Sequence, residues 1–522
     1  MSLCWRRFGL KGVGVLLCVL LLSSCSLVAK HVQGPMATAL PVSPSYTLLD
    51  RVVQPLLDAH PGHDSGVAFL GDAIPAFMAR AYTARAAERS LDVQYYIWRH
   101  DNAGRILQHE IMKAADRGVR VRMLVDDVNV AGRDNELLAM SAHPNIQIRI
   151  FNPAYSRDSR ILRALEVTLR FFSFNRRMHN KAWIADNRMA IVGGRNIGDQ
   201  YFGAADSQYR DTDLLLIGRA VQQTSAIFDE FWNAREVTPL TLLRKKGSSW
   251  SQQAFEQRMQ QWRYDAADTP WGRAMASVAH SQQGVFGEGL TFYWPDSVRV
   301  VSDPPEKAAP IAKRREEASW LMYDVLSLLY SAEQETWVIS PYFVPGNNGV
   351  LQLAGQVKRG KRVRVLTNSL AANDVPLVHA GYKKYRKPLL EYGVELYEMK
   401  PENDDTNREI LGSSGASLHS KAFLVDGRRG FVGSFNLDPR SAQLNTEMGV
   451  LFDSVELAAQ LNEFFEKSID ATHAWRLSLT PDQAALRWHD DSAKVWHRDP
   501  ETSGGLRFLT WFFGLFPIES QL

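Results

Sequence analysis

The sequence predicts an α/β protein built from two similar domains. The first observation is an internal repeat, because residues 115–127 recur as 357–369 with the same pattern of charge and hydrophobicity. Each copy follows a helical pattern, and Gly118 or Gly360 ends that helix before an alternating strand. The second is length, since 522 residues exceed one ordinary hydrophobic core. A composition of 45% hydrophobic and 22% charged residues is typical of a globular chain.

The repeat extends beyond these segments. Aromatic-rich strands are expected at 91–98 and 337–344, and further strands at 146–153 and 394–401. The order strand, helix, strand, helix, strand therefore occurs twice. This order predicts two α/β halves with parallel or mixed sheets and right-handed crossover connections.

A second repeated motif follows each of these units. Its first copy runs from His179 through Lys181 to Asp186, and a Gly-Gly-Arg-Asn segment ends at Asn196. Its second copy contains His419, Lys421 and Asp426, and ends at Asn436. Both copies read as β-hairpins, with turns at residues 186–187 and 426–427.

The spacing within the motif suits phosphodiester chemistry. Residues i and i+2 of a strand share a face, so each His projects beside its Lys. A neutral imidazole can attack phosphorus or carry a proton, while an ammonium neutralises the phosphate oxygens. Asn196 and Asn436 are expected to donate hydrogen bonds to the same oxygens. Asp186 and Asp426 complete the motif, and their turn positions suggest that they organise the site rather than react.

Each imidazole also needs a carboxylate that holds its other nitrogen. The segments 210–213 and 444–447 align across the repeat and supply the candidates. Glu447 is expected to orient the His of the second half, and Asp213 or Asp211 the His of the first.

The two His-x-Lys-x4-Asp motifs resemble the phospholipase D superfamily over nearly the whole chain. Segments 95–98, 175–179, 193–199, 373–382 and 413–419 are similar to bacterial cardiolipin synthases of the C type. The resemblance implies two α/β domains around one shared active site, and a ping-pong transfer without metal or other cofactor. It also implies His179 as nucleophile and His419 as acid and base, an order that the sequence does not decide.

Cardiolipin synthesis by this family implies a phosphatidyl donor, phosphatidylethanolamine or phosphatidylglycerol, and phosphatidylglycerol as acceptor. The family-like segment 373–382 suggests headgroup contacts from Asn373, Asp374, His379 and Tyr382, although a hydrogen-bonded structural role for His379 is an equal alternative. A lipid hydrolase of the phospholipase D type, an exported phosphodiesterase or nuclease, and a lipid-binding scaffold remain open.

The N-terminus resembles a lipoprotein signal. Basic residues in the first eleven positions precede an apolar run, 13–22, that is too short to span a membrane, and Leu-Ser-Ser-Cys follows. Cleavage before Cys25 and its lipidation would anchor the chain on the periplasmic face. Ser26 favours the outer membrane over the inner. The lipoprotein-like terminus itself is a departure from the C-type pattern.

Phospholipids and a membrane surface are thus the expected partners. Nucleic acid is not expected, because the net charge of +3 comes from the signal segment alone. An accessory protein stays open. The predicted organisation is a signal peptide at 1–24, a tether at 25–60, a first domain at 61–238, a connector at 239–300, a second domain at 301–475 and a tail at 476–522.

Two further segments combine apolar and basic or aromatic residues. Residues 156–174 form an amphipathic stretch that either lines a path for acyl chains or packs on its own domain. Residues 506–518 form either an interfacial anchor or a packed terminal element. His60, His63 and Asp64 lack a further partner at metal-ligand spacing, so no metal site is expected.

Overall fold

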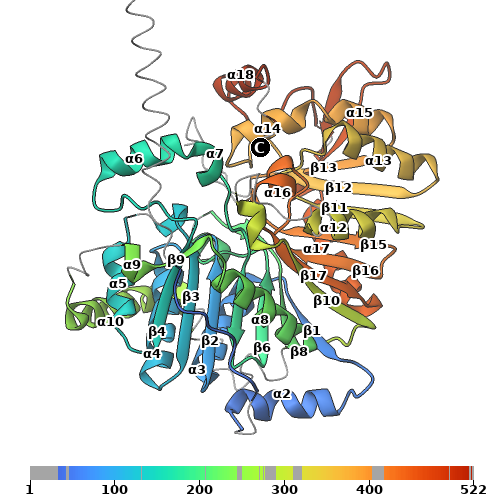
Figure 1. Cartoon of the computed structure of the whole chain (residues 1–522). Helices are drawn as coiled ribbons and strands as arrows, with labels where there is room; N and C mark the ends of the chain where they lie inside the picture. Colours follow the sequence, from blue (N-terminus) through green and yellow to red (C-terminus); the bar gives the residue numbers. More distant parts are fainter. Residues whose placement is uncertain are drawn as a thin grey trace, which may run out of the picture.

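Two β-sheets, one in each half of the chain, form the centre of the protein (Figure 1). The computed structural model describes residues 33–42, 46–130, 132–205, 207–243, 250–269, 271–273, 276, 290–309, 320–401, 417–492, 494–516, and 519. The expected signal peptide, Cys25 and part of the tether lie outside these residues.

The first sheet has the strand order β1-β8-β6-β5-β2-β3-β4-β9. Strands β2, β3 and β4 are parallel, and their other neighbours pair antiparallel. The strands are β1 (Ser65–Leu70), β2 (Ser90–Tyr95), β3 (Arg120–Asp126), β4 (Ile146–Phe151), β5 (Ala182–Ala185), β6 (Met189–Gly193), β8 (Asp213–Gly218) and β9 (Val237–Pro239).

The second sheet repeats this order as β10-β17-β16-β15-β11-β12-β13-β18 and adds β19 and β20 at one edge. Its parallel strands are β11, β12 and β13. The strands are β10 (Ser297–Ser302), β11 (Glu335–Ile339), β12 (Arg362–Asn368), β13 (Glu395–Met399), β15 (Lys421–Val425), β16 (Arg429–Gly433), β17 (Met448–Asp453), β18 (Ala474–Leu479), β19 (Leu486–His489) and β20 (Val495–Trp496).

The helices fill the connections that the repeat predicts. In the first half they are α2 (Leu48–Asp58), α3 (Ala73–Ala86), α4 (Asn102–Asp116), α5 (Asp134–Ser141), α6 (Arg160–Leu169), α7 (Phe171–Phe174), α8 (Arg219–Trp232), α9 (Leu240–Leu243) and α10 (Gln252–Ala267). In the second half they are α12 (Leu321–Tyr330), α13 (Gly346–Lys358), α14 (Pro376–Lys383), α15 (Arg386–Glu391), α16 (Pro439–Gln443), α17 (Val455–Ile469) and α18 (Gly504–Phe513). Short 3₁₀ turns cover Val128–Val130, Asp199–Tyr201 and Pro305–Ala308.

The predicted repeat is confirmed at this level. Helices α4 and α13 end just before Gly118 and Gly360, whose φ values of 95° and 80° are left-handed and favour glycine. Both predicted hairpins also form, as β5–β6 and β15–β16. The chain is therefore two α/β halves with the same strand order.

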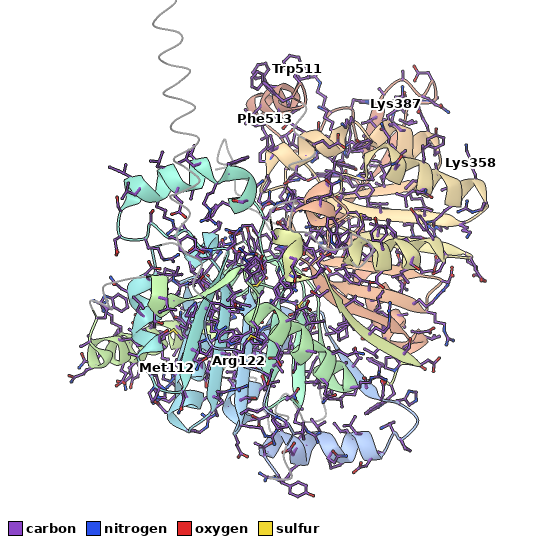
Figure 2. All side chains as sticks on the ribbon, in the orientation of Figure 1. Met112, Arg122, Lys358, Lys387, Trp511 and Phe513 are labelled. Carbon is purple, nitrogen blue, oxygen red and sulfur yellow. The ribbon has the colours of Figure 1, made fainter. Side chains whose placement is uncertain are left out.

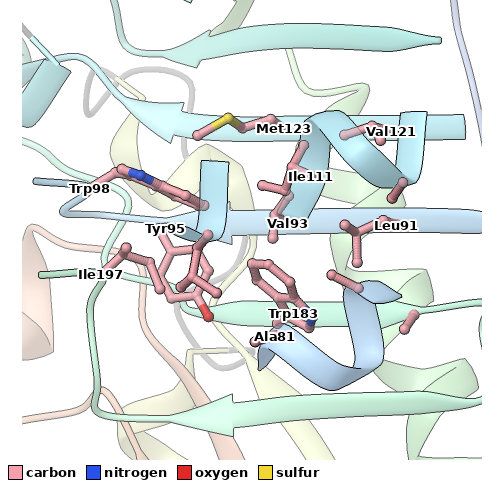
Figure 3. Packing of buried hydrophobic residues seen from close by; sticks show 14 of the residues in the cluster. Ala81, Leu91, Val93, Tyr95, Trp98, Ile111, Val121, Met123, Trp183 and Ile197 are labelled. Atoms are coloured by element: carbon pink, nitrogen blue, oxygen red, sulfur yellow. The ribbon is translucent and has the colours of Figure 1, made fainter. Parts of the chain in front are cut away.

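Hydrophobic packing closes each half and joins the two. In the first half the side chains of Val93, Ile111, Met123 and Trp183 pack between β2, β3, β5 and α4 (Figure 3). A second cluster runs from one half into the other, and includes Leu214 and Val192 as well as Val450 and Val432. The halves are therefore held together by a common core.

The halves also exchange short backbone segments next to the two motifs. Strand β7 (Tyr209–Arg210) of the first half pairs parallel with β14 (Ser417–Leu418) of the second. Met178 of the first half forms a parallel bridge with Thr446 of the second. Each His motif therefore lies against a strand segment from the opposite half.

Ordered elements occupy parts of the expected tether, connector and tail. The tether region contains α2, which begins with a capping box between Thr47 and Asp50. The connector contains α9 and α10, and β10 begins within it at Ser297. The tail contributes β19 and β20 to the second sheet. In all the residues described, the helices are too short or too polar to span a bilayer.

Candidate active site

His179 is buried and His419 is largely buried, and each donates to a carboxylate. His179 lies between α7 and β5, and its Nδ1 is 2.7 Å from Oε2 of Glu447. His419 lies between β14 and β15, and its Nδ1 is 2.6 Å from Oδ2 of Asp211. Each imidazole is thus fixed through Nδ1, which leaves Nε2 for chemistry.

The sequence predicted that each histidine is held by a carboxylate from its own half, and this prediction is wrong. Glu447 holds the His of the first half, and Asp211 holds the His of the second. The exchanged segments explain this, because His179 N donates to Thr446 O and His419 N donates to Arg210 O, both at 2.8 Å. The carboxylate that follows each acceptor is therefore beside the imidazole of the opposite half.

The structure also corrects the alignment behind that prediction. In the antiparallel pairings of β6 with β8 and of β16 with β17, Gly193 pairs with Asp213, whereas Gly433 pairs with Gly449. The equivalent of Glu447 in the first half is therefore Asp211, two residues before Asp213.

Asp213 has a different role from the predicted one. Its carboxylate binds the buried guanidinium groups of Arg80 and Arg195, at 2.9 and 3.4 Å. It also accepts from the backbone N–H of Arg195 at 3.2 Å. Asp213 therefore holds the backbone just before Asn196 in place and makes no hydrogen bond to either motif imidazole.

The motif lysines lie beside their histidines as predicted. Lys181 Nζ donates to the carbonyl of His179 at 2.7 Å, and Lys421 Nζ donates to the carbonyl of His419. Burial lowers the pKa of Lys181 to about 7 and that of Lys421 to about 8, although nearby carboxylates including Glu447 and Asp211 oppose the shift. A phosphate anion between these ammonium groups would be bound strongly because little water screens them.

Burial also sets the state of both imidazoles. It lowers the pKa of His179 to about 4 and that of His419 to about 3, with the motif lysines adding to the effect and the bound carboxylates opposing it. Burial opposes ionisation of Asp211, yet His419 and Lys421 bring its pKa down to about 2. The free site at neutral pH therefore has neutral imidazoles whose Nδ1–H is held by an anionic carboxylate.

The third motif residues lie at the turns, away from the reacting groups. About 16 Å of extended chain separates Asp186 from Lys181. Asp186 accepts from the backbone N–H groups of residues 88–90, and Asp426 from those of residues 333–335. Each therefore ties its hairpin turn to the start of β2 or β11.

The two motif asparagines differ in their partners. Asn196 accepts from Ile97 N at 3.1 Å and donates one amide hydrogen to the Tyr201 hydroxyl at 3.0 Å. Asn196 is fully buried, and these contacts fix the orientation of its amide. Asn436 Oδ1 is buried, and nothing in the described parts of the chain donates to it.

The segment 373–382 divides into a part near the site and a part remote from it. Asp374 accepts from the Tyr342 hydroxyl at 2.7 Å and acts electrostatically on Lys421. Asn373 instead accepts from Val375 N within its own turn.

His379 and Tyr382 point into the second half instead. His379 Nε2 is 2.6 Å from Arg386, which also binds Glu398 and Asp499, and Tyr382 packs beside His379. Of the two alternatives for His379, the hydrogen-bonded structural role is the one that these contacts support.

Tyrosine rings around both imidazoles were missed from the sequence. Tyr96 meets His179 edge-on with ring centroids 5.0 Å apart, and Tyr201 meets His419 in the same way at 5.1 Å. Tyr209 lies 5.2 Å from His419. Strand alternation offered a signal for Tyr96, because its neighbour Tyr95 faces the core (Figure 3).

Ser434 also supports the site. Its hydroxyl donates to Glu447 Oε2 at 2.5 Å and accepts from Met448 N at 3.0 Å. Ser434 therefore helps to keep the Glu447 carboxylate turned toward His179.

Metal-ligand clusters were sought in the same described residues, and no group of three His, Cys, Asp or Glu side chains fits one. His60 stacks on Trp294, and His63 Nδ1 lies 3.0 Å from the carbonyl of Pro295. These contacts give both residues structural roles.

Paired imidazoles, held by carboxylates and flanked by lysines, define a site for phosphodiester chemistry of the phospholipase D type. The chain matches the family model "Cardiolipin synthase, PLD-like domain" over residues 83–232 and 325–469. It is 40% identical to cardiolipin synthase C of Escherichia coli strain K12, over 90% of this chain and 99% of that protein. A cardiolipin synthase of Geobacillus thermodenitrificans is 27% identical, over 74% of this chain and 62% of that protein.

The fold has a solved relative. A phosphatidylserine synthase of Haemophilus influenzae aligns with a TM-score of 0.57 and 15% identity, over 91% of this chain and 100% of that one. Both copies of the family model fall on the two halves described above. The chain belongs to the cardiolipin synthase family of phospholipase D-like proteins.

Proposed function

We propose that this protein is a phosphatidyltransferase that makes cardiolipin through a phosphohistidine intermediate. The proposal rests chiefly on one observation: a carboxylate from the opposite half holds each imidazole through Nδ1, where the two halves meet. Two imidazoles with free Nε2 atoms supply one nucleophile and one proton carrier. The relatives named cardiolipin synthase support the choice of product.

In the first step, His179 Nε2 attacks the phosphorus of the donor lipid. The bond from phosphorus to the headgroup oxygen breaks, and His419 gives its proton to that oxygen, so the alcohol leaves. The phosphatidyl group is then bound to His179. The donor phosphate brings the negative charge that favours the protonated form of His419.

In the second step, His419 removes a proton from a hydroxyl of phosphatidylglycerol. That oxygen attacks phosphorus, the phosphorus–nitrogen bond breaks, and His179 is regenerated as cardiolipin forms. Lys181 and Lys421 stabilise the charge that gathers on the non-bridging oxygens in both steps. Asn196 and Asn436 are the proposed further contacts to those oxygens.

The proposed donor is phosphatidylethanolamine or phosphatidylglycerol, and the proposed acceptor is phosphatidylglycerol. Asp374, with Tyr342, is the proposed headgroup contact from the segment 373–382. We further propose that Cys25 carries lipid and anchors the chain at the periplasmic face, on the outer membrane. The sequence Leu-Ser-Ser-Cys and the following Ser26 support this placement.

Incubation of the purified protein with labelled phosphatidylethanolamine and phosphatidylglycerol tests the function. Cardiolipin is the expected product, separated from phosphatidic acid by chromatography. Phosphatidic acid alone would make the protein a lipid hydrolase and overturn the proposal. With neither product, cleavage of a nucleic acid or a soluble phosphodiester would identify the exported phosphodiesterase.

A further inference from the structure

Helix α6 presents its apolar face to solvent. Ile161, Leu162, Leu165 and Leu169 all lie on one side of the helix, and their exposed fractions run from 54% to 81%. A helix on the surface of a soluble domain normally turns such a face toward the core.

The polar face of α6 is the one that contacts the protein. Glu166 accepts from the backbone N–H groups of Tyr155 and Ser156, and it pairs with Arg170 at 2.6 Å. Arg163 binds the buried carboxylate of Asp127 at 2.8 Å. The helix is therefore fixed by ion pairs in an orientation that keeps its leucines outside.

The C-terminal segment 504–516 repeats this arrangement in the other half. Phe508, Trp511, Phe512, Leu515 and Phe516 follow helical spacing, and Phe508 and Trp511 are 63% and 55% exposed. Thr510, on the opposite side, is buried, and α18 packs on α14. Trp511 lies at the outer edge of the protein (Figure 2).

Both elements lie on the same side of the protein and lead to the candidate active site. In Figure 1, α6 and α18 are both at the upper edge of the view. The chain runs from α6 through α7 directly to His179. Helix α14, beneath α18, follows Asp374, whose carboxylate lies near Lys421. Each half therefore contributes one apolar element whose neighbouring chain segment leads to the site.

We propose that the exposed faces of α6 and of residues 504–516 form a surface that docks on an anionic phospholipid bilayer. This surface places the active site against the membrane that holds its substrates, and the inference rests on the function proposed above. It gives the catalytic body its own contact with lipid, independent of any lipid on Cys25.

Charge supports an anionic lipid surface as the partner. The side chains of Lys383, Lys384 and Lys387, in and just after α14, are 40%, 55% and 48% exposed, and each pairs with a carboxylate. Basic residues beside inserted apolar side chains are typical of helices that lie in the headgroup region of anionic membranes.

Area admits two partners for this surface, lipid or a second copy of the chain, and the experiment below separates them. An exposed aromatic or leucine side chain offers on the order of 100 Å², so each apolar face offers about 400–500 Å² and the two together about 800–1,000 Å². A stable protein interface takes about 800 Å² from each partner. Insertion into lipid needs no minimum area, because each apolar side chain gains free energy on its own.

Hydroxyl-radical footprinting of the full-length protein tests the docking surface without any turnover. We expect vesicles of phosphatidylethanolamine and phosphatidylglycerol to reduce modification of Leu165, Phe508 and Trp511 at least about fivefold. Tyr264 on α10, 72% exposed and away from the surface, is the internal control and should not change. Unchanged modification at the three side chains would overturn the proposal. If modification of these side chains instead fell as the protein concentration rose, without vesicles, the surface would be an interface between copies of the chain, and the lipid proposal would be overturned.

Variants give a second, independent measurement. L162Q/L165Q and F508S/W511S should each weaken binding to these vesicles about tenfold in flotation, whereas L242Q should not, although Leu242 is as exposed as Leu165. Phosphatidylcholine vesicles should bind the wild type less, and equal binding would overturn the anionic assignment. Because neither assay measures cardiolipin, docking and the proposed function can fail separately.

Discussion

His179 contacts one tyrosine ring, whereas His419 contacts two, which also contact each other. His179 is held by a glutamate that Ser434 supports, and His419 by an aspartate that accepts from its own neighbour, Thr212 N. Burial lowers the pKa of both Lys181 and Lys421, but Asp374 and Asp438 are among the carboxylates that oppose the shift at Lys421, whereas Lys421 itself adds to the shift at Lys181.

The comparison teaches that the two halves share reacting groups but surround them differently. Each half supplies the imidazole of one unit and the carboxylate of the other. A single half would therefore lack the carboxylate that fixes its own imidazole. The exchange makes the site dependent on both halves, while the differing rings allow the two histidines to take different roles.

The largest expected effect comes from removing either imidazole. H179A and H419A should each lower cardiolipin formation at least about a thousandfold, because nucleophile and proton carrier act on the same phosphate. H497A, at an exposed histidine, is the matched control and should keep wild-type rates. Appreciable transfer by either variant would contradict a shared site.

The same two variants separate the roles. With a labelled donor whose headgroup leaves without protonation, H419A should still accumulate a phosphohistidine at His179, and H179A should accumulate none. Mass spectrometry of the trapped protein detects the adduct. The opposite pattern would exchange the roles of the two histidines.

The next effect tests whether each histidine depends on the carboxylate from the opposite half. E447Q and D211N should each lower turnover about a hundred- to ten-thousand-fold, since the imidazole loses its fixed tautomer. E447Q should reproduce the adduct pattern of H179A, and D211N that of H419A. If each variant instead reproduced the pattern of the histidine in its own half, the crossed geometry would be contradicted.

A smaller effect concerns pH. Buried lysines with pKa values of about 7 and 8 must be protonated to hold phosphate, and His419, with a pKa of about 3, must be protonated for the first step. We therefore expect kcat/KM to fall with pH across the neutral range and most steeply, at least about tenfold per pH unit, above pH 8. A bound phosphate anion raises the pKa of both lysines, so the fall in kcat should lie at higher pH. A pH series of initial rates measures both. Coincident profiles, or activity that rises with pH, would contradict this role of the lysines.

The smallest effect distinguishes the turn aspartates. Asp186 is fully buried and Asp426 partly exposed, although each accepts from three backbone N–H groups. D186N should therefore lower the free energy of unfolding by about 2–3 kcal/mol, and D426N by about 1 kcal/mol. Denaturant unfolding measures both. Turnover per folded molecule should remain at the wild-type value, and a large loss would indicate a direct part in the reaction.

Much of the architecture followed from local patterns. The repeat at 115–127 and 357–369, the two hairpins and the helices that end before Gly118 and Gly360 all depend on residues close in sequence. The positions of His179 and His419 next to their lysines also needed only strand periodicity. Helix α2, within the expected tether, was missed, because its apolar side chains are buried only by packing against the first domain.

The sequence by itself determined the fold class, the duplicated histidine and lysine motif and the phosphodiester chemistry, because each rests on residues a few positions apart. Only the tertiary structure decided which carboxylate holds which histidine, since Glu447 and His179 are 268 residues apart and meet through segments that the halves exchange. It also decided that the leucines of α6 face outward, because hydrophobic spacing defines an apolar face but not its direction.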